Sequence, residues 1–153
     1  MSILVAVAGC SSRVFGENIA TCQDLAGYSY FHEYGLVPKG KDGFQNDKLS
    51  DALTTLVRLS ENKFDLLFVD ARKSIISTLQ SGGDVRMLRH GTNDATFLVF
   101  YQGMVIELYT FYRDDGGKIR YDLLQSKGGD GMPIHKSSVL TGDCSELNLS
   151  ILP

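Results

Sequence analysis

Two adjacent segments, residues 95–101 and residues 104–112, carry apolar or aromatic side chains at most positions, and only Gln102 and Gly103 separate them. A two-residue connection that contains glycine is typical of a β-hairpin, because glycine adopts the positive φ of such turns without steric cost. Alternation along the second segment places on one side Val105, Glu107, Tyr109 and Phe111. Since the opposite side is also largely apolar, we expect this strand to be central and covered on both faces.

The chain after this hairpin continues as strands joined by turns. Residues 114–117, Asp-Asp-Gly-Gly, form the next expected turn and lead into a strand at residues 118–125. A glycine-rich loop follows at residues 127–133, and a last, edge-like strand is expected within residues 139–152. Residues 95–153 therefore predict an antiparallel meander.

The first half of the chain alternates buried-strand patterns with helical patterns. Continuous apolar runs predict strands at residues 3–8 and residues 64–69. Asp47 is a plausible helix N-cap, and apolar residues three and four apart after it predict a helix at residues 48–60.

Two further helices are expected, at residues 71–80, where Gly82 and Gly83 provide a stop, and at residues 17–25, although the aromatic residues that follow favour a strand or turn. The order of elements therefore predicts a single α+β domain over residues 1–153. Its mixed β-sheet has an N-terminal βαβα half and a C-terminal antiparallel meander, with helices packed on the sheet. A chain of 153 residues is long enough to bury such a core.

Composition and charge narrow the classes of partner. The net charge of -3 gives no electrostatic footprint for a phosphate backbone, so a nucleic-acid partner is not expected. No apolar run is long enough to span a membrane, and the start of the chain lacks the basic region and long apolar run of a signal peptide. A membrane partner is therefore not expected either.

Three cysteines, Cys10, Cys22 and Cys144, are widely spaced, whereas small secreted scaffolds usually carry an even and denser set. We therefore expect three free thiols in a reducing compartment, and hence a cytoplasmic protein. The histidines stand alone and no Cys-x-x-Cys is present, so neither a metal site nor a cofactor is expected.

The first expected strand runs into Gly9-Cys10-Ser11-Ser12-Arg13. This segment resembles the phosphate-binding loop of nucleotidyltransferases of the sugar-phosphate and molybdopterin type. Backbone amides after a strand can form an anion site, and the resemblance implies that Ser11, Ser12 and Arg13 contact phosphate. The loop has one glycine where that family has two, and no Asp-x-Asp metal pair follows on a later strand.

The second expected strand reads Phe64-Asp65-Leu66-Leu67-Phe68-Val69 and ends at Asp70. It resembles the central strand of a response-regulator receiver domain, which implies phosphorylation at Asp70. The first strand lacks the paired acidic residues that hold Mg²⁺ in that family, and hairpins follow where another βα unit belongs. Asp70 is therefore interpreted as the N-cap of the helix that follows.

The polar stretch between the two halves contains Leu88-Arg89-His90-Gly91-Thr92. It resembles the Arg-His-Gly-x-Thr signature of the histidine phosphatase and phosphoglycerate mutase families, whose histidine takes the phosphoryl group and whose arginine binds it. In those families the signature follows the first strand, whereas here it lies in the middle of the chain. We therefore interpret His90 as a loop histidine.

The favoured hypothesis is a non-catalytic regulatory or protein-interaction domain that acts through an apolar, aromatic antiparallel sheet. Its support is the apolar strand at residues 104–112 and the absence of a complete catalytic set, which makes an enzyme the less favoured interpretation. It implies a protein partner or self-association. The candidate interaction face consists of Tyr101, Tyr109, Phe111, Tyr112 and Tyr121.

The alternative hypothesis is a small enzyme or binding protein for a phosphorylated compound, with an anion-binding loop after the first strand. Ligands of α/β sheets bind at the carboxyl ends of strands, where the loops of this chain would converge. The candidate ligand-binding residues are Ser11, Ser12, Arg13, Asp70, Arg89 and His90.

Overall fold

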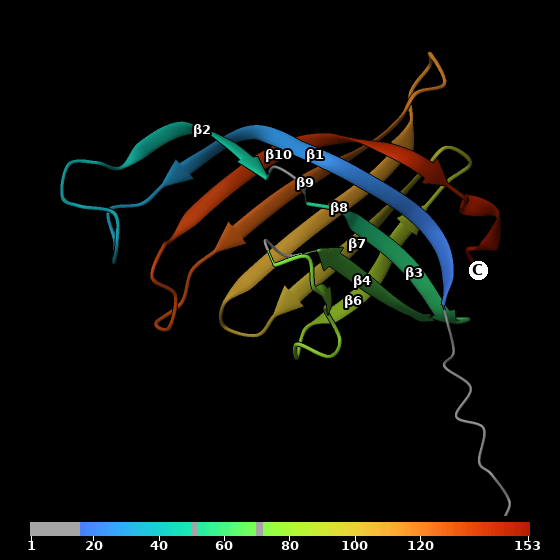
Figure 1. Ribbon diagram of the computed structural model, residues 1–153, viewed down its shortest axis with the longest axis horizontal. Coiled ribbons are helices and arrows are strands. Elements are labelled where there is room, and N and C mark those ends of the chain that lie inside the picture. Colours follow the sequence, from blue (N-terminus) through green and yellow to red (C-terminus); the bar gives the residue numbers. More distant parts are fainter. Residues whose placement is uncertain (1–15, 50–51, 70–71) are drawn as a thin grey trace, which may run out of the picture.

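The computed structural model describes residues 16–49, 52–69 and 72–153. It is nearly all antiparallel β-sheet, with 63% of the described residues in strands, and the sheet curls into a half-barrel (Figure 1). The strands lie in the order β5-β4-β3-β1-β10-β9-β8-β7-β6, and β2 pairs with β1 beside this path. The strands are β1 (Glu17–Phe31), β2 (Gly43–Leu49), β3 (Thr54–Ser60), β4 (Lys63–Val69), β5 (Ile75–Ser77), β6 (Asp84–His90), β7 (Asp94–Tyr101), β8 (Val105–Arg113), β9 (Ile119–Lys127) and β10 (Lys136–Leu147).

The expected α+β class is wrong, because each described segment that was expected to be helical contributes strand instead. Residues 17–25 belong to β1, residues 48–49 to β2 and residues 54–60 to β3, and β5 lies at residues 75–77. The one helix in the described part of the chain is the short 3-10 turn η1 (Leu149–Ile151). None of the described residues form a helix long and apolar enough to cross a membrane. The strand expected at residues 3–8 lies outside the described residues.

The expected helix at residues 48–60 fails because its apolar spacing also fits a strand. Thr54 and Leu56 are buried with a less buried residue between them, and β-branched residues favour the extended backbone. Asp47, expected to cap this helix, instead accepts hydrogen bonds from the Ser29 hydroxyl at 2.6 Å and from Lys136 Nζ at 2.5 Å. Partners distant in sequence therefore override the local helical signal.

The segment at residues 71–80 turns back for a similar reason. The carboxylate of Asp65 accepts hydrogen bonds from the Ser77 hydroxyl at 2.5 Å and from the backbone N–H of Leu79 at 3.1 Å. This buried carboxylate holds the chain in a turn directly after β5. The backbone N–H groups of Thr78 and Leu79 are therefore bonded to β4 and not within a helix.

The hairpin expected around Gln102 and Gly103 is confirmed, but its connection has three residues, 102–104, and not the expected two, because Tyr101 pairs with Val105. Strands β7 and β8 pair in continuous antiparallel register, Gly103 has φ +74, and the Met104 N–H donates to the Tyr101 carbonyl at 3.0 Å. Two neighbouring expectations are wrong. The last strand, β10, is central rather than edge-like, and the polar stretch before β7 is itself a strand, β6.

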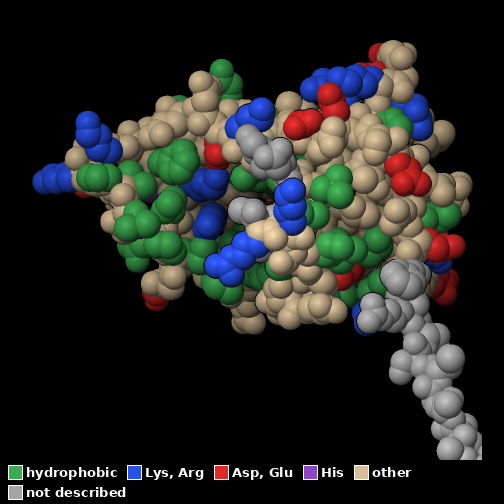
Figure 2. All heavy atoms as spheres, in the orientation of Figure 1, with side chains coloured by type: hydrophobic (Ala, Val, Ile, Leu, Met, Phe, Trp, Pro, Cys, Tyr) green, Lys and Arg blue, Asp and Glu red, His purple; other side chains and the backbone are tan. Residues whose placement is uncertain are grey.

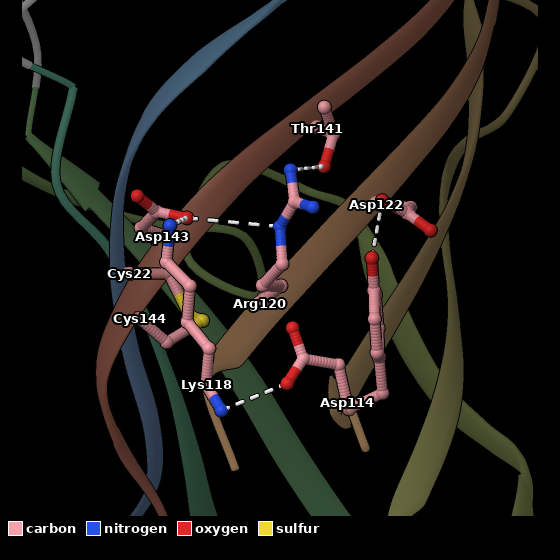
Figure 3. A network of polar contacts seen from close by, with 9 residues as sticks. Cys22, Asp114, Lys118, Arg120, Asp122, Thr141, Asp143 and Cys144 are labelled. Carbon is pink, nitrogen blue, oxygen red and sulfur yellow. Dashed lines mark hydrogen bonds and ion pairs between the residues drawn. A yellow bond between two sulfur atoms is a disulfide. The ribbon is translucent and has the colours of Figure 1, made fainter. Parts of the chain in front are cut away.

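Strands β1 and β10 join the two halves of the chain into one sheet (Figure 1). Their backbones approach closely at Gly27, where an added Cβ would lie 2.1 Å from the carbonyl oxygen of Val139. A disulfide between Cys22 and Cys144, with Cα atoms 3.9 Å apart, links the same two strands (Figure 3). Three free thiols were expected; two of these cysteines are instead joined, and Cys10 lies outside the described residues.

The core fills the inside of the curl. Phe64 of β4 packs edge-on against Phe97 of β7, with ring centroids 5.1 Å apart, so the two arms of the sheet meet across its interior. Phe97 in turn contacts Phe111, which stacks on Tyr121 at 5.9 Å. Fully or almost fully buried residues around these rings include Ile19, Leu56, Leu66, Val99, Leu123 and Leu140.

The disulfide is expected to contribute strongly to stability, because it closes a sequence separation of 122 residues. Replacing both cysteines (Cys22→Ala with Cys144→Ala), or reducing the wild type, should lower the free energy of unfolding by about 2–5 kcal/mol. Urea unfolding with and without reductant measures this loss. Equal stabilities of the reduced and oxidised wild type would show that the two cysteines are not joined in the protein.

Candidate functional site

A cavity of about 1200 Å³ opens on the concave face of the sheet, next to the core. It lies toward the end of β7 and β8 where Tyr101 pairs with Val105, whereas the aromatic core lies toward their other end, where Ala95 pairs with Phe111. Figure 2 shows Lys and Arg side chains gathered around a hollow on the visible face. The cavity is lined by Gln23, Asp24, Leu25, Leu49, Ala52, Leu53, Thr54, Leu66, Phe68, Val69, Lys73, Thr78, Tyr101, Val105, Glu107, Tyr109, Leu123, Gln125 and Lys127.

An irregularity in β1 shapes one wall of this cavity. Three consecutive residues, Gln23, Asp24 and Leu25, line it, although alternate residues of a regular strand point to opposite faces. The β1–β10 register shifts between Gln23 and Ala26, and Asp24 has φ +60. A bulge of this kind re-aims side chains, and it explains how neighbouring residues reach the same cavity.

A partly buried carboxylate, that of Glu107, forms the polar part of the cavity wall. Glu107 Oε1 accepts a hydrogen bond from Gln125 Nε2 at 2.7 Å, and Glu107 Oε2 accepts one from the Tyr109 hydroxyl at 3.1 Å. Burial raises the pKa of Glu107, although these two hydrogen bonds and the charges of Lys127 and Lys136 oppose the rise. Burial also raises the pKa of Tyr109 well above its usual value, helped by the charge of Glu107. Tyr109 therefore stays a hydrogen-bond donor to this carboxylate.

The polar wall continues across the sheet as a row of inward-facing side chains. Glu107 pairs with Gln125, Gln125 with Ser138, and Ser138 with Ser29. The hydroxyls of Ser138 and Ser29 are 2.6 Å apart, and Ser29 donates to Asp47. We call these five residues the inner polar row. It runs from β8 to β2 across a face that elsewhere packs the core.

The far end of the inner polar row is charged but paired. Burial opposes ionisation of Asp47, yet hydrogen bonds from Lys136 and Ser29 outweigh it and lower the pKa of Asp47. Lys136 also lies over the ring of Phe31, 5.6 Å from its centroid. This end of the row is therefore satisfied within the protein.

Two of the six candidate phosphate-binding residues, Arg89 and His90, lie in the described part of the chain. The other four, Ser11, Ser12, Arg13 and Asp70, lie outside it. Arg89 and His90 are exposed at the end of β6 that pairs with Thr96 and Ala95, and Arg89 binds the carboxylate of Asp94. Neither residue lines the cavity.

The aromatic residues expected to form one interaction face are divided between the two faces of the sheet. Tyr101 and Tyr109 line the cavity, while Phe111 and Tyr121 are fully buried in the core. Burial raises the pKa of Tyr121 to about 12. Tyr112 points to the convex face, where its hydroxyl lies 3.4 Å from Asp122. A partner role for this set stays a prediction.

The cavity residues Glu107, Gln125 and Lys127 were not singled out from the sequence. A signal for the first was present, because Glu107 is the one charged residue on its side of a strand whose two faces were both expected to be covered. A charged side chain on such a face is retained only where a partner or a function compensates its burial. The partner, Gln125, could not be inferred without the register of β8 and β9.

No protein-family model, curated protein or solved structure matches the chain. Among the described residues, no group of three or more His, Cys, Asp or Glu side chains is placed to hold a metal ion. The described lining of the cavity offers an apolar wall, a partly buried carboxylate with two donors, and nearby ammonium groups.

The raised pKa of Glu107 has a definite consequence for stability. Between the ordinary pKa of an unfolded glutamate and the raised pKa of the folded state, the folded protein holds a proton that the unfolded chain has lost, so stability falls as the pH rises. Glu107→Gln removes this dependence. Its free energy of unfolding should therefore increase relative to wild type as the pH rises from about 4 to about 8.

Urea unfolding over this pH range measures the difference. Glu61→Gln, in the exposed turn between β3 and β4, serves as the control and should follow the wild type. A constant difference between Glu107→Gln and wild type at every pH would contradict the burial of an ionisable Glu107.

Proposed function

We propose that this protein is a non-catalytic binding protein whose concave cavity holds a small, largely apolar molecule. The observation that carries the proposal is the cavity of about 1200 Å³ beside the core, with Leu53, Phe68 and Val105 on its wall. Small-molecule sites are concave and mostly apolar, with a few polar groups that fix orientation. Glu107, hydrogen-bonded by its neighbours, supplies such a group.

Two adjacent residues of β8 allow a matched test, because they point to opposite faces of the sheet. Val105 lines the cavity, whereas the side chain of Ile106 is exposed on the convex face. Val105→Trp should obstruct part of the cavity and lower the affinity for an uncharged fluorescent reporter such as N-phenyl-1-naphthylamine at least about tenfold, while Ile106→Trp should bind as wild type does. Fluorescence titration measures both affinities.

The outcomes separate the cavity from other sites. Equal binding by wild type and Val105→Trp would place the reporter elsewhere and overturn the proposal, as would failure of the wild type to bind it. Urea unfolding of the two variants checks that both are folded. A reporter that binds the folded state alone must also raise the melting temperature, and the rise must grow with the logarithm of its concentration above Kd.

A second function, protein association, has its own support on the convex face. Aligned apolar residues of five neighbouring strands form a continuous line there, since Leu98 pairs with Leu108, Leu108 with Leu124, Leu124 with Val139, and Val139 with Tyr28. We call these five residues the outer apolar row. Leu124, Val139 and Tyr28 are 48%, 63% and 62% exposed, and contiguous exposed apolar surface is typical of interaction sites.

Self-association through the outer apolar row predicts a mass that depends on concentration. Leu124→Thr combined with Val139→Thr keeps side chains suited to strands but removes apolar surface, so it should shift the protein toward the single-chain mass. Ser126→Thr, an exposed polar position two residues from Leu124 along β9, is the control. Sedimentation velocity over a wide range of concentration measures the masses. A wild type that sediments as one chain throughout would overturn self-association.

The alternative of a phosphorylated ligand depends on Ser11, Ser12, Arg13 and Asp70 and stays a prediction, because these residues lie outside the described chain.

The disulfide also bears on the cellular compartment of the protein. The cytoplasmic location expected from the sequence rested on free thiols, whereas disulfides persist mainly in oxidising compartments. With Cys22 and Cys144 joined, we propose an oxidising compartment instead.

A further inference from the structure

The ionic groups of the cavity are unequally satisfied. Both carboxylate oxygens of Glu107 accept hydrogen bonds, whereas the ammonium groups of Lys73 and Lys127 have no hydrogen-bond or ion-pair partner among the described residues. Lys136, on the adjacent strand β10, shows the contrast, because it is paired with Asp47. The polar groups of the cavity that lack a hydrogen-bond partner are therefore mainly positively charged donors.

The remaining carboxylate of the lining does not change this balance. Asp24 and Lys73 are both exposed, so water and salt screen their opposite charges alike, and the less exposed Lys127 is the main cation of the lining. Glu107 is attracted by Lys127, but its two hydrogen bonds already hold it on the cavity wall. A cationic head group would have to share the oxygens of Glu107 with the donors of Gln125 and Tyr109, while an anionic head group would meet the ammonium group of Lys127, which no described residue hydrogen-bonds.

Resting on the proposed function, we infer that the cavity takes an amphiphile with one anionic head group, such as a carboxylate. Its head group binds the ammonium groups of Lys127 and Lys73. Its apolar part lies against Leu53, Phe68 and Val105, apolar lining residues that are not fully buried. The charge-assisted hydrogen bonds fix the orientation of the ligand, and the apolar wall supplies most of the affinity.

Three probes with the same alkyl chain and different head groups test this inference: dodecanoate, dodecan-1-ol and dodecyltrimethylammonium. Each is titrated against the protein loaded with N-phenyl-1-naphthylamine, and displacement gives the affinity. Dodecanoate should bind about tenfold or more tightly than the other two. The double variant Lys73→Met with Lys127→Met should bind dodecanoate and dodecan-1-ol equally, whereas Lys39→Met, in an exposed loop, should behave as wild type.

The outcomes distinguish the head group from the cavity itself. Equal affinities for the three probes in the wild type, or tightest binding of the cation, would overturn the anionic head group and leave the proposed function intact. Failure of the reporter and of all three probes to bind would instead overturn the proposed function. Displacement by phosphatidylglycerol vesicles as well as by dodecanoate would identify a membrane lipid as the source of the anionic amphiphile, and displacement by dodecanoate alone a free acid.

Discussion

The pairing of β1 with β10 is the contact on which the rest of the structure depends. It brings a strand from the start of the described chain beside one from its end, and thereby joins β5, β4 and β3 to the meander of β9, β8, β7 and β6. Gly27 permits the close approach of the two backbones, and the Cys22–Cys144 disulfide fixes it covalently. Without this seam there would be two separate small sheets, each with an apolar face in water, and no enclosed space between them.

Part of this architecture could be predicted from the sequence. The hairpin at Gln102 and Gly103 was found because turn chemistry and two-residue periodicity are both local signals. The helix expected at residues 48–60 failed because a short apolar run fits either period, and the choice was made by distant partners such as Lys136 for Asp47. The disulfide was missed for the same reason, since nothing local relates Cys22 to Cys144.

The candidate site was even harder to predict from the sequence than the fold, because it is formed by rows of side chains that run across neighbouring strands. Glu107, Gln125 and Ser138 become neighbours only through the register of β8, β9 and β10. The same registers align Leu108, Leu124 and Val139 on the opposite face. A change of one residue in register would exchange the inner polar row with residues of the convex face. The aromatic positions, by contrast, were visible in the sequence, but their division between two faces was not.

The two ends of the curl serve different physical needs. At one end Phe64, Phe97 and Phe111 close the interior with aromatic packing, which stabilises the sheet without any ligand. At the other end the interior is left open, and Glu107 and Lys127 are held beside an apolar wall. Burying a charged group opposes folding, so such a group is tolerable only where packing elsewhere provides the stability. Substitutions within the cavity should therefore alter binding more than folding, which makes the cavity the part of the sheet most free to become specific for its ligand.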